Sequence, residues 1–212
     1  MKRSTIFLIP FVLSSACALW ADTVEYTFTL NTSSIVGTAG SLDFALNPGA
    51  GSDQSLTAVV SAFSTDGTFG GAQTLTGDAT GGPVITGSPL TLNATFADND
   101  DLETFVYGNT LSFNVDLSGP ALSAPDGLAT SPYEFIFSTY SDSGGTVPVL
   151  TSDPGGASGT ITISPEAVID AGAISPELDI VATPEPSILW LLSCALAIFA
   201  GVRYARRRLL PH

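Results

Sequence analysis

Closely spaced carboxylates near the middle of the chain are the densest group of side chains that could do chemistry. The six residues from 98 to 103 contain Asp98, Asp100, Asp101 and Glu103. Calcium takes six to eight oxygen ligands, and neighbouring carboxylates can supply them. The spacing lacks the Gly and the terminal Glu of an EF-hand loop. Two interpretations therefore stand side by side, a calcium site formed by these four carboxylates and a solvated acidic turn.

The composition excludes most other catalytic chemistry from the body of the chain. The sequence holds 20 Asp and Glu against 6 Lys and Arg and one His, and residues 22–202 contain no Lys, Arg, His or Met. Residues 22–189 also contain no Cys or Trp. A Ser–His or Cys–His catalytic set, a Lys Schiff base and a Cys/His zinc site therefore cannot form there. We expect no enzyme and no resident cofactor; a carboxylate-pair glycoside hydrolase is the one enzyme class that these residues allow.

Charge and aromatic content limit the binding partners. A body rich in acids and devoid of bases repels phosphates, so nucleic acid is not expected as a partner. A carbohydrate-binding module is the alternative binding function, and it would use exposed aromatic rings. We expect Tyr26 and Tyr133 in the core, because both fit the inward face of a strand. Tyr140, next to Ser141–Gly144, is the Tyr most free to face a sugar.

Alternation of apolar and polar residues predicts that strands position these side chains. The alternating segments are Val24–Leu30, Leu42–Leu46, Leu90–Phe96, Leu111–Leu117, Tyr133–Phe137, Ile161–Ile163 and Leu178–Ile180, with weaker candidates at Leu56–Phe63 and Val147–Leu150. Turns rich in Gly, Pro, Asn and Asp separate them. We predict an all-β fold in which residues 22–180 form a single antiparallel β-sandwich or jelly roll.

The acidic segment itself fits two secondary structures. Asp98 could cap a helix over Asp98–Tyr107, and the acids that follow would suit the positive N-terminal end of that helix. A loop that leads into a short strand is the competing prediction.

The first 21 residues have the layout of a secretory signal peptide. Lys2 and Arg3 precede an apolar run, and small residues follow it. The run is too short to span a membrane. We place the cleavage between Ala21 and Asp22, where the charged, alternating body begins, although residues 16–18 also match the A-x-A pattern. The chain should therefore pass through an export translocon.

The C-terminal end has three consecutive parts. A Pro-rich linker over residues 181–187 contains Pro184, Glu185, Pro186 and Ser187. An apolar segment follows, and we predict a transmembrane helix over residues 188–205. Residues 206–212 form a basic cytoplasmic tail, and the basic cluster comprises Arg203, Arg206, Arg207 and Arg208. Because basic residues stay on the cytoplasmic side, the precursor should be anchored in the inner membrane with its body facing outward.

This tripartite order resembles the PEP-CTERM sorting signal of exported bacterial proteins. Pro-Glu-Pro-Ser at 184–187, one apolar helix and a terminal Arg cluster carry the resemblance, and Thr183 stands where Val is common. The resemblance implies recognition by an exosortase, cleavage near the motif, and delivery to the cell surface or extracellular matrix. It also implies a structural or adhesive role linked to exopolysaccharide or biofilm. A plain membrane anchor with a Pro-rich stalk is the competing interpretation.

The body is loosely similar to the small, uncharacterised β-sandwich ectodomains of such proteins. Residues 41–47 and 108–113 carry this similarity. It implies a sandwich fold and no activity.

Overall fold

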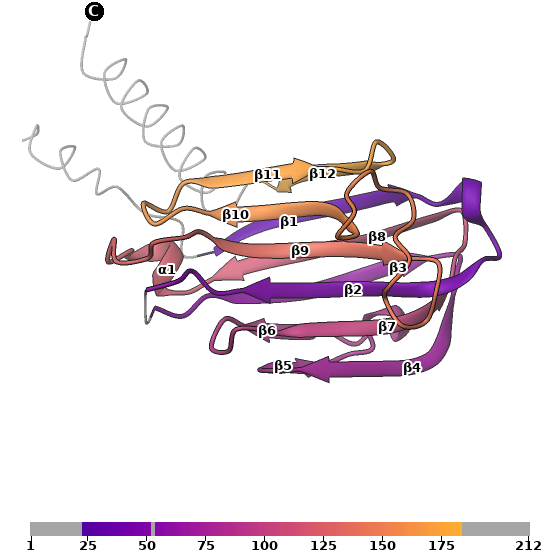
Figure 1. Ribbon diagram of the computed structural model, residues 1–212, viewed down its shortest axis with the longest axis horizontal. Coiled ribbons are helices and arrows are strands. Elements are labelled where there is room, and N and C mark those ends of the chain that lie inside the picture. Colours follow the sequence, from indigo (N-terminus) through magenta and orange to yellow (C-terminus); the bar gives the residue numbers. More distant parts are fainter. Residues whose placement is uncertain (1–22, 52–53, 184–212) are drawn as a thin grey trace, which may run out of the picture.

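The computed structural model describes residues 23–51 and 54–183, which are coloured in Figure 1. The predicted signal cleavage at Ala21–Asp22, the motif Pro184–Ser187, the helix 188–205 and the basic cluster lie outside these residues. Within the described ranges, no helix is long and apolar enough to cross a membrane. The structure therefore bears on the body of the chain.

The body is an antiparallel β-sandwich of two six-stranded sheets, which confirms the predicted all-β fold. Sheet A has the order β12-β1-β8-β3-β6-β5, formed by Leu178–Thr183, Thr23–Asn31, Thr110–Ser118, Thr57–Thr65, Leu90–Asn93 and Ala79–Gly81. Sheet B, in front in Figure 1, has the order β11-β10-β9-β2-β7-β4, formed by Ile169–Ala173, Ala157–Ile163, Tyr133–Tyr140, Ala39–Asn47, Asp100–Val106 and Thr68–Thr76. Three single turns complete the body, the 3-10 turns η1 (Ser33–Ile35) and η2 (Val84–Thr86) and the helix α1 (Pro120–Ser123).

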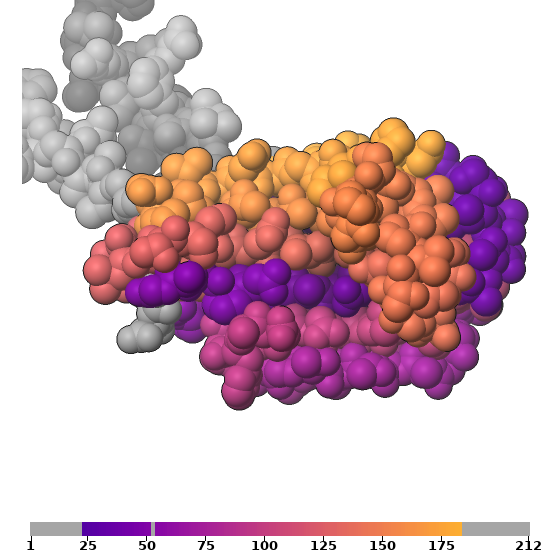
Figure 2. All heavy atoms as spheres, in the orientation of Figure 1, coloured from indigo at the N-terminus to yellow at the C-terminus, as the bar shows by residue number. Residues whose placement is uncertain are grey.

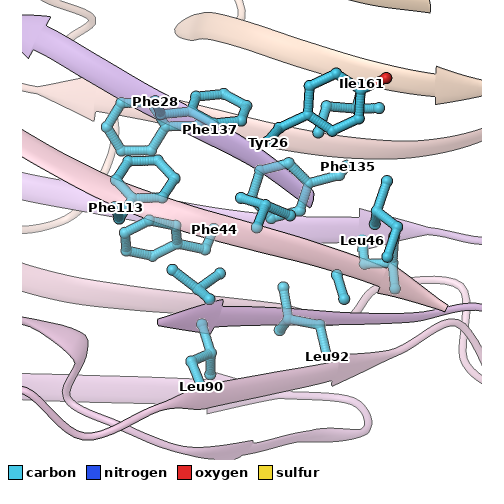
Figure 3. Packing of buried hydrophobic residues seen from close by; sticks show 14 of the residues in the cluster. Tyr26, Phe28, Phe44, Leu46, Leu90, Leu92, Phe113, Phe135, Phe137 and Ile161 are labelled. Atoms are coloured by element: carbon cyan, nitrogen blue, oxygen red, sulfur yellow. The ribbon is translucent and has the colours of Figure 1, made fainter. Parts of the chain in front are cut away.

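Four Phe rings from both sheets form the centre of the core (Figure 3). Phe28 and Phe113 are register partners on β1 and β8, and their rings stack with centroids 4.9 Å apart. Phe44 and Phe137 are register partners on β2 and β9 at 5.4 Å. The Phe113 and Phe137 rings meet across the sandwich at 4.8 Å. Each such aromatic contact adds about 0.5–1.5 kcal/mol to the hydrophobic term, so this cluster ties the two sheets together.

Short connections close both sides of the sandwich. β4 and β5 are consecutive strands at matching edges of sheets B and A, and β11 and β12 have the same relation at the opposite edges. The chain thus crosses from one sheet to the other at each side, and the paired strands contact each other there. Both layers are consequently held at the edges as well as through the core.

Several sequence predictions need correction. Asp98–Tyr107 is not a helix, because residues 100–106 form β7, as the competing prediction of a short strand had it. β6 ends at Asn93, which leaves Phe96 beyond the strand. The segment Val147–Leu150 forms no strand and makes only an isolated bridge at Pro148. β4, β5 and β11 were not predicted, and β12 extends through residues 181–183 of the predicted linker.

Candidate functional site

The predicted calcium ligands do not converge. Because successive side chains of a strand point to opposite faces, Asp101 and Glu103 point into the sandwich while Asp100 points outward. Asp98 precedes the strand and is exposed. Within the described residues, no three His, Cys, Asp or Glu side chains gather so that they could hold a metal ion. The structure therefore does not assemble the calcium site that these four residues suggested.

Asn99, inside the predicted cluster, organises the turn before β7. Its side-chain nitrogen donates to the carbonyl oxygens of Leu46 at 3.0 Å and Phe96 at 2.7 Å. Its Oδ1 atom accepts a hydrogen bond from the backbone N–H of Asp78 at 3.0 Å. The side chain is almost completely buried. An amide that satisfies three backbone groups holds this turn in place, so the polar segment is structural.

Asp101 and Glu103 form a buried carboxyl pair, which we call the inner pair. Both side chains are fully buried, and their carboxyl groups hydrogen-bond to each other. Glu103 Oε1 accepts a hydrogen bond from the backbone N–H of Val84 at 2.6 Å, and Oε2 accepts one from Ile85 at 3.4 Å. The side-chain nitrogen of Gln73 donates to Asp101 Oδ2 at 3.0 Å. The pair therefore fastens η2 and β4 to β7.

The inner pair must hold a proton at neutral pH. Burial, followed by the hydrogen bond to Asp101, raises the pKa of Glu103 to about 8, although the N–H groups of Val84 and Ile85 oppose the shift. Burial also raises the pKa of Asp101. Residues 22–202 contain no basic side chain that could compensate two buried negative charges. A shared proton therefore removes one of the two negative charges that the pair would otherwise bury.

Asp43, on the outward side of β2, is a third carboxyl whose pKa is raised. It lies opposite Leu102 of β7 and Ser138 of β9. Burial raises its pKa to about 7, and the nearby charges of Asp100 and Asp101 raise it as well. Within the described residues, no donor reaches its buried Oδ1 atom. This carboxyl is therefore also protonated over part of the neutral range.

A loop over residues 141–156 covers part of the outer face of sheet B, where it stands out in orange in Figure 2. The Ser41 hydroxyl donates to the carbonyl oxygen of Asp142 at 2.8 Å, and the Tyr140 hydroxyl donates to that of Gly155 at 3.2 Å. The Asp142 carboxylate accepts hydrogen bonds from the N–H groups of Val147 and Thr146, at 2.7 and 2.9 Å, which lowers its pKa. The loop is thus pinned to the sheet.

This arrangement corrects the prediction for Tyr140. Its side chain is only 7% exposed, so it cannot serve as a platform for a sugar. Tyr26 and Tyr133 are buried, as predicted. Within the described residues, the exposed aromatic side chain is instead Phe96, 59% exposed, which lines a groove of about 390 Å³ together with Pro48 and Thr95.

A second carboxyl pair, which we call the outer pair, lies on the outer face of sheet A. Glu25 on β1 and Asp116 on β8 are direct register partners, and their carboxyl groups hydrogen-bond to each other. Asn114 Nδ2 donates to Glu25 Oε1 at 3.3 Å, and Thr27 Oγ1 donates to Asn114 Oδ1 at 3.1 Å. Partial burial, followed by the Glu25 charge and the shared hydrogen bond, raises the pKa of Asp116.

Sequence reasoning missed the outer pair for a clear reason. Alternation correctly sends Glu25 and Asp116 outward, but it does not say that β1 and β8 are neighbours or which residues face each other. Only the register sets these two acids opposite one another. Like charges directly opposite each other destabilise a sheet, so charge alone would predict a different register of β1 and β8.

Comparisons with protein-family models, with curated proteins and with solved structures gave no match to this chain.

Proposed function

We propose that this chain is an exported bacterial surface or matrix protein, sorted through Pro184–Ser187 and processed by an exosortase. The observation that carries the proposal is that one folded sandwich lies in the interval between the two processing signals. β1 begins at Thr23, one residue after the predicted cleavage, and β12 ends at Thr183, directly before the motif. The folded body is thus what would remain after both cleavages.

The pairing of β1 with β12 supports the same topology. Glu25 and Thr183 are register partners, so the described chain begins and ends at the same end of sheet A. A precursor held by both a signal peptide and a C-terminal helix needs its two ends on the side that faces the membrane. Pro184 has no backbone N–H with which to extend a strand ladder.

A structural or adhesive role fits this body better than catalysis does. The inner pair is buried, so a substrate cannot reach it. In the outer pair the two carboxyl groups are hydrogen-bonded to each other. Glycosidases instead keep their two carboxyl groups about 5–9.5 Å apart to leave room for the glycosidic bond or a water. For the alternative function as a carbohydrate-binding module, the candidate ring is the exposed Phe96 and no longer Tyr140.

The intact mass of the mature protein from its native cells tests the proposal. Tryptic peptides cannot replace this measurement, since no Lys or Arg lies between Arg3 and Arg203. We expect a chain that begins at Asp22 and ends between Thr183 and Ser187, with any additional mass reporting an attached group.

The matched control is a variant in which Pro184, Glu185 and Pro186 are all replaced by Ala, and it should retain the C-terminal tail. A native chain that still includes Arg206–His212 contradicts sorting and leaves a simple membrane anchor.

A further inference from the structure

The two outer faces of the sandwich differ in what covers them. On sheet B, Ser41, Ser138 and Tyr140 point outward and are nevertheless buried, because loop 141–156 lies over that part of the sheet. On sheet A, the outward side chains of the central strands β1 and β8 remain half-buried or exposed. The face of sheet A is therefore open to a partner along its central strands.

The open face consists mainly of groups that form hydrogen bonds. On β1, β8, β6 and β12 its side chains are hydroxyls, amides and carboxylates except for Val181, and β3 adds Val59. Some are already paired across strands, as in the 2.9 Å bond from Thr57 Oγ1 to Asn93 Oδ1. On its described strands, the face carries none of the Trp, Tyr and Arg side chains that dominate protein–protein hot spots. A hydroxyl-rich polymer matches such a surface better than a folded protein does.

The charge of the face selects among such polymers. The outer pair sets two acidic side chains opposite each other on this face, and Thr27 and Asn114 are linked to it by hydrogen bonds. No basic side chain exists in residues 22–202 to balance it. An anionic polysaccharide would be repelled. A protonated amine offers three donors and a positive charge, and its hydrogen bonds to carboxylates are the strong, charge-assisted kind.

We propose that the outer face of sheet A binds a polysaccharide that carries free amino groups, with an ammonium group at Glu25 and Asp116 and sugar hydroxyls on the neighbouring Thr and Asn side chains. On binding, the ammonium donates charge-assisted hydrogen bonds to the carboxyl groups of Glu25 and Asp116. The inference rests on the proposed location outside the cell, where such a polymer would be met.

Binding of the full 212-residue chain, kept in a mild detergent, to immobilised chitosan tests the proposal. Chitosan is a partly deacetylated glucosamine polymer, and its fully acetylated counterpart, chitin, provides the matched neutral probe. A chelator in the buffer removes divalent cations that could occupy the outer pair. We expect the chain to bind chitosan and not chitin. We also expect the double variant Glu25→Gln/Asp116→Asn to lose about tenfold in affinity or more, as removal of charge-assisted hydrogen bonds predicts.

Two control variants make the result specific to this face. Glu166→Gln/Asp170→Asn removes the same charge from exposed positions at and beside the edge strand β11 of sheet B and should change the affinity less than about twofold. Phe96→Ala should bind chitosan normally. Equal losses in both double variants would reduce the effect to bulk charge, and a loss in Phe96→Ala would move the site to the groove. Either result overturns the proposal.

Three further results also overturn it. These are no binding to chitosan, equal binding to chitin, and tighter binding to polylysine with the same dependence on the outer pair, which would indicate a basic protein partner. None of these outcomes changes the mass of the mature chain. Failure of this inference and failure of the proposed sorting are therefore distinguishable.

Discussion

The inner and outer carboxyl pairs have the same chemistry in opposite surroundings. Glu103 of the inner pair accepts hydrogen bonds from two backbone N–H groups, and Asp101 accepts one from Gln73. The outer pair accepts a hydrogen bond from Asn114 on the same face, and the rest of the pair borders solvent. In a body without a single base, a carboxyl pair either takes donors from the fold, as the inner pair does at every oxygen except Asp101 Oδ1, or borders solvent, where a cation can reach it. The first arrangement builds structure, and the second can bind.

The same contrast in surroundings explains why burial affects the pKa values of the two pairs differently. Burial is the largest cause in both pairs, but it is complete for Glu103, whose pKa reaches about 8. For Asp116 burial is partial, and solvent screens the repulsion from Glu25. We therefore expect the inner pair to couple the stability of the fold to pH, and the outer pair to respond mainly to salt.

The largest expected difference between the two pairs is the loss in the free energy of unfolding when one carboxyl is removed from each. Glu103→Ala strands the N–H groups of Val84 and Ile85 in the interior, so we expect a loss of about 3 kcal/mol in the free energy of unfolding. Glu25→Ala removes a partly exposed charge, and we expect a change within about 0.5 kcal/mol. Urea unfolding of both variants measures the difference. Glu103→Gln, which keeps an acceptor for Val84, is the control with a smaller loss, and equal losses in the two Ala variants would contradict the contrast.

The pH dependence of stability is the next largest effect. Between its ordinary pKa of 4.5 and its folded value of about 8, Glu103 is protonated in the native state and ionised in the unfolded chain. Asp43 behaves in the same way between 3.8 and about 7. The unfolded state therefore binds fewer protons, and stability falls as the pH rises from about 5 to 8, by up to about 1.4 kcal/mol per pH unit for each group.

Unfolding midpoints across this pH range test the dependence. In Glu103→Gln the part above about pH 7 should disappear, because Asp43 has by then lost its proton in both states. A protein whose stability rises between pH 5 and 8 would refute the protonated inner pair.

The sequence predicted the fold well wherever alternation was clean. Leu111–Leu117 lies within β8, with its apolar residues inward, because one face of that strand is apolar and the other polar. β7 inverts this pattern, with Leu102 outward and two acids inward, so periodicity could not show that Asp101 and Glu103 are buried. β4 has no buried side chain at all, and alternation had nothing to detect.

The candidate sites depended on information that lies between strands. The donors for Glu103 come from η2, about twenty residues away in sequence, and the partner of Glu25 comes from β8. Neither spacing follows a local motif. Tyr140 shows the complementary error, because a Tyr beside a polar loop looked free and that same loop buries it.

The smallest expected effect concerns the outer pair in the absence of a ligand. Glu25→Gln/Asp116→Asn removes a like-charge contact from the sheet, so we expect the free energy of unfolding to rise by a few tenths up to about 1 kcal/mol at low salt. The gain should shrink as salt screens the wild-type repulsion. Urea unfolding at two ionic strengths measures it, with Glu166→Gln/Asp170→Asn as the matched control for net charge. A stabilised outer-pair variant that binds chitosan weakly would mean that the two acids lower stability but are needed for binding. A destabilised variant would mean that the outer pair, like the inner pair, stabilises the fold.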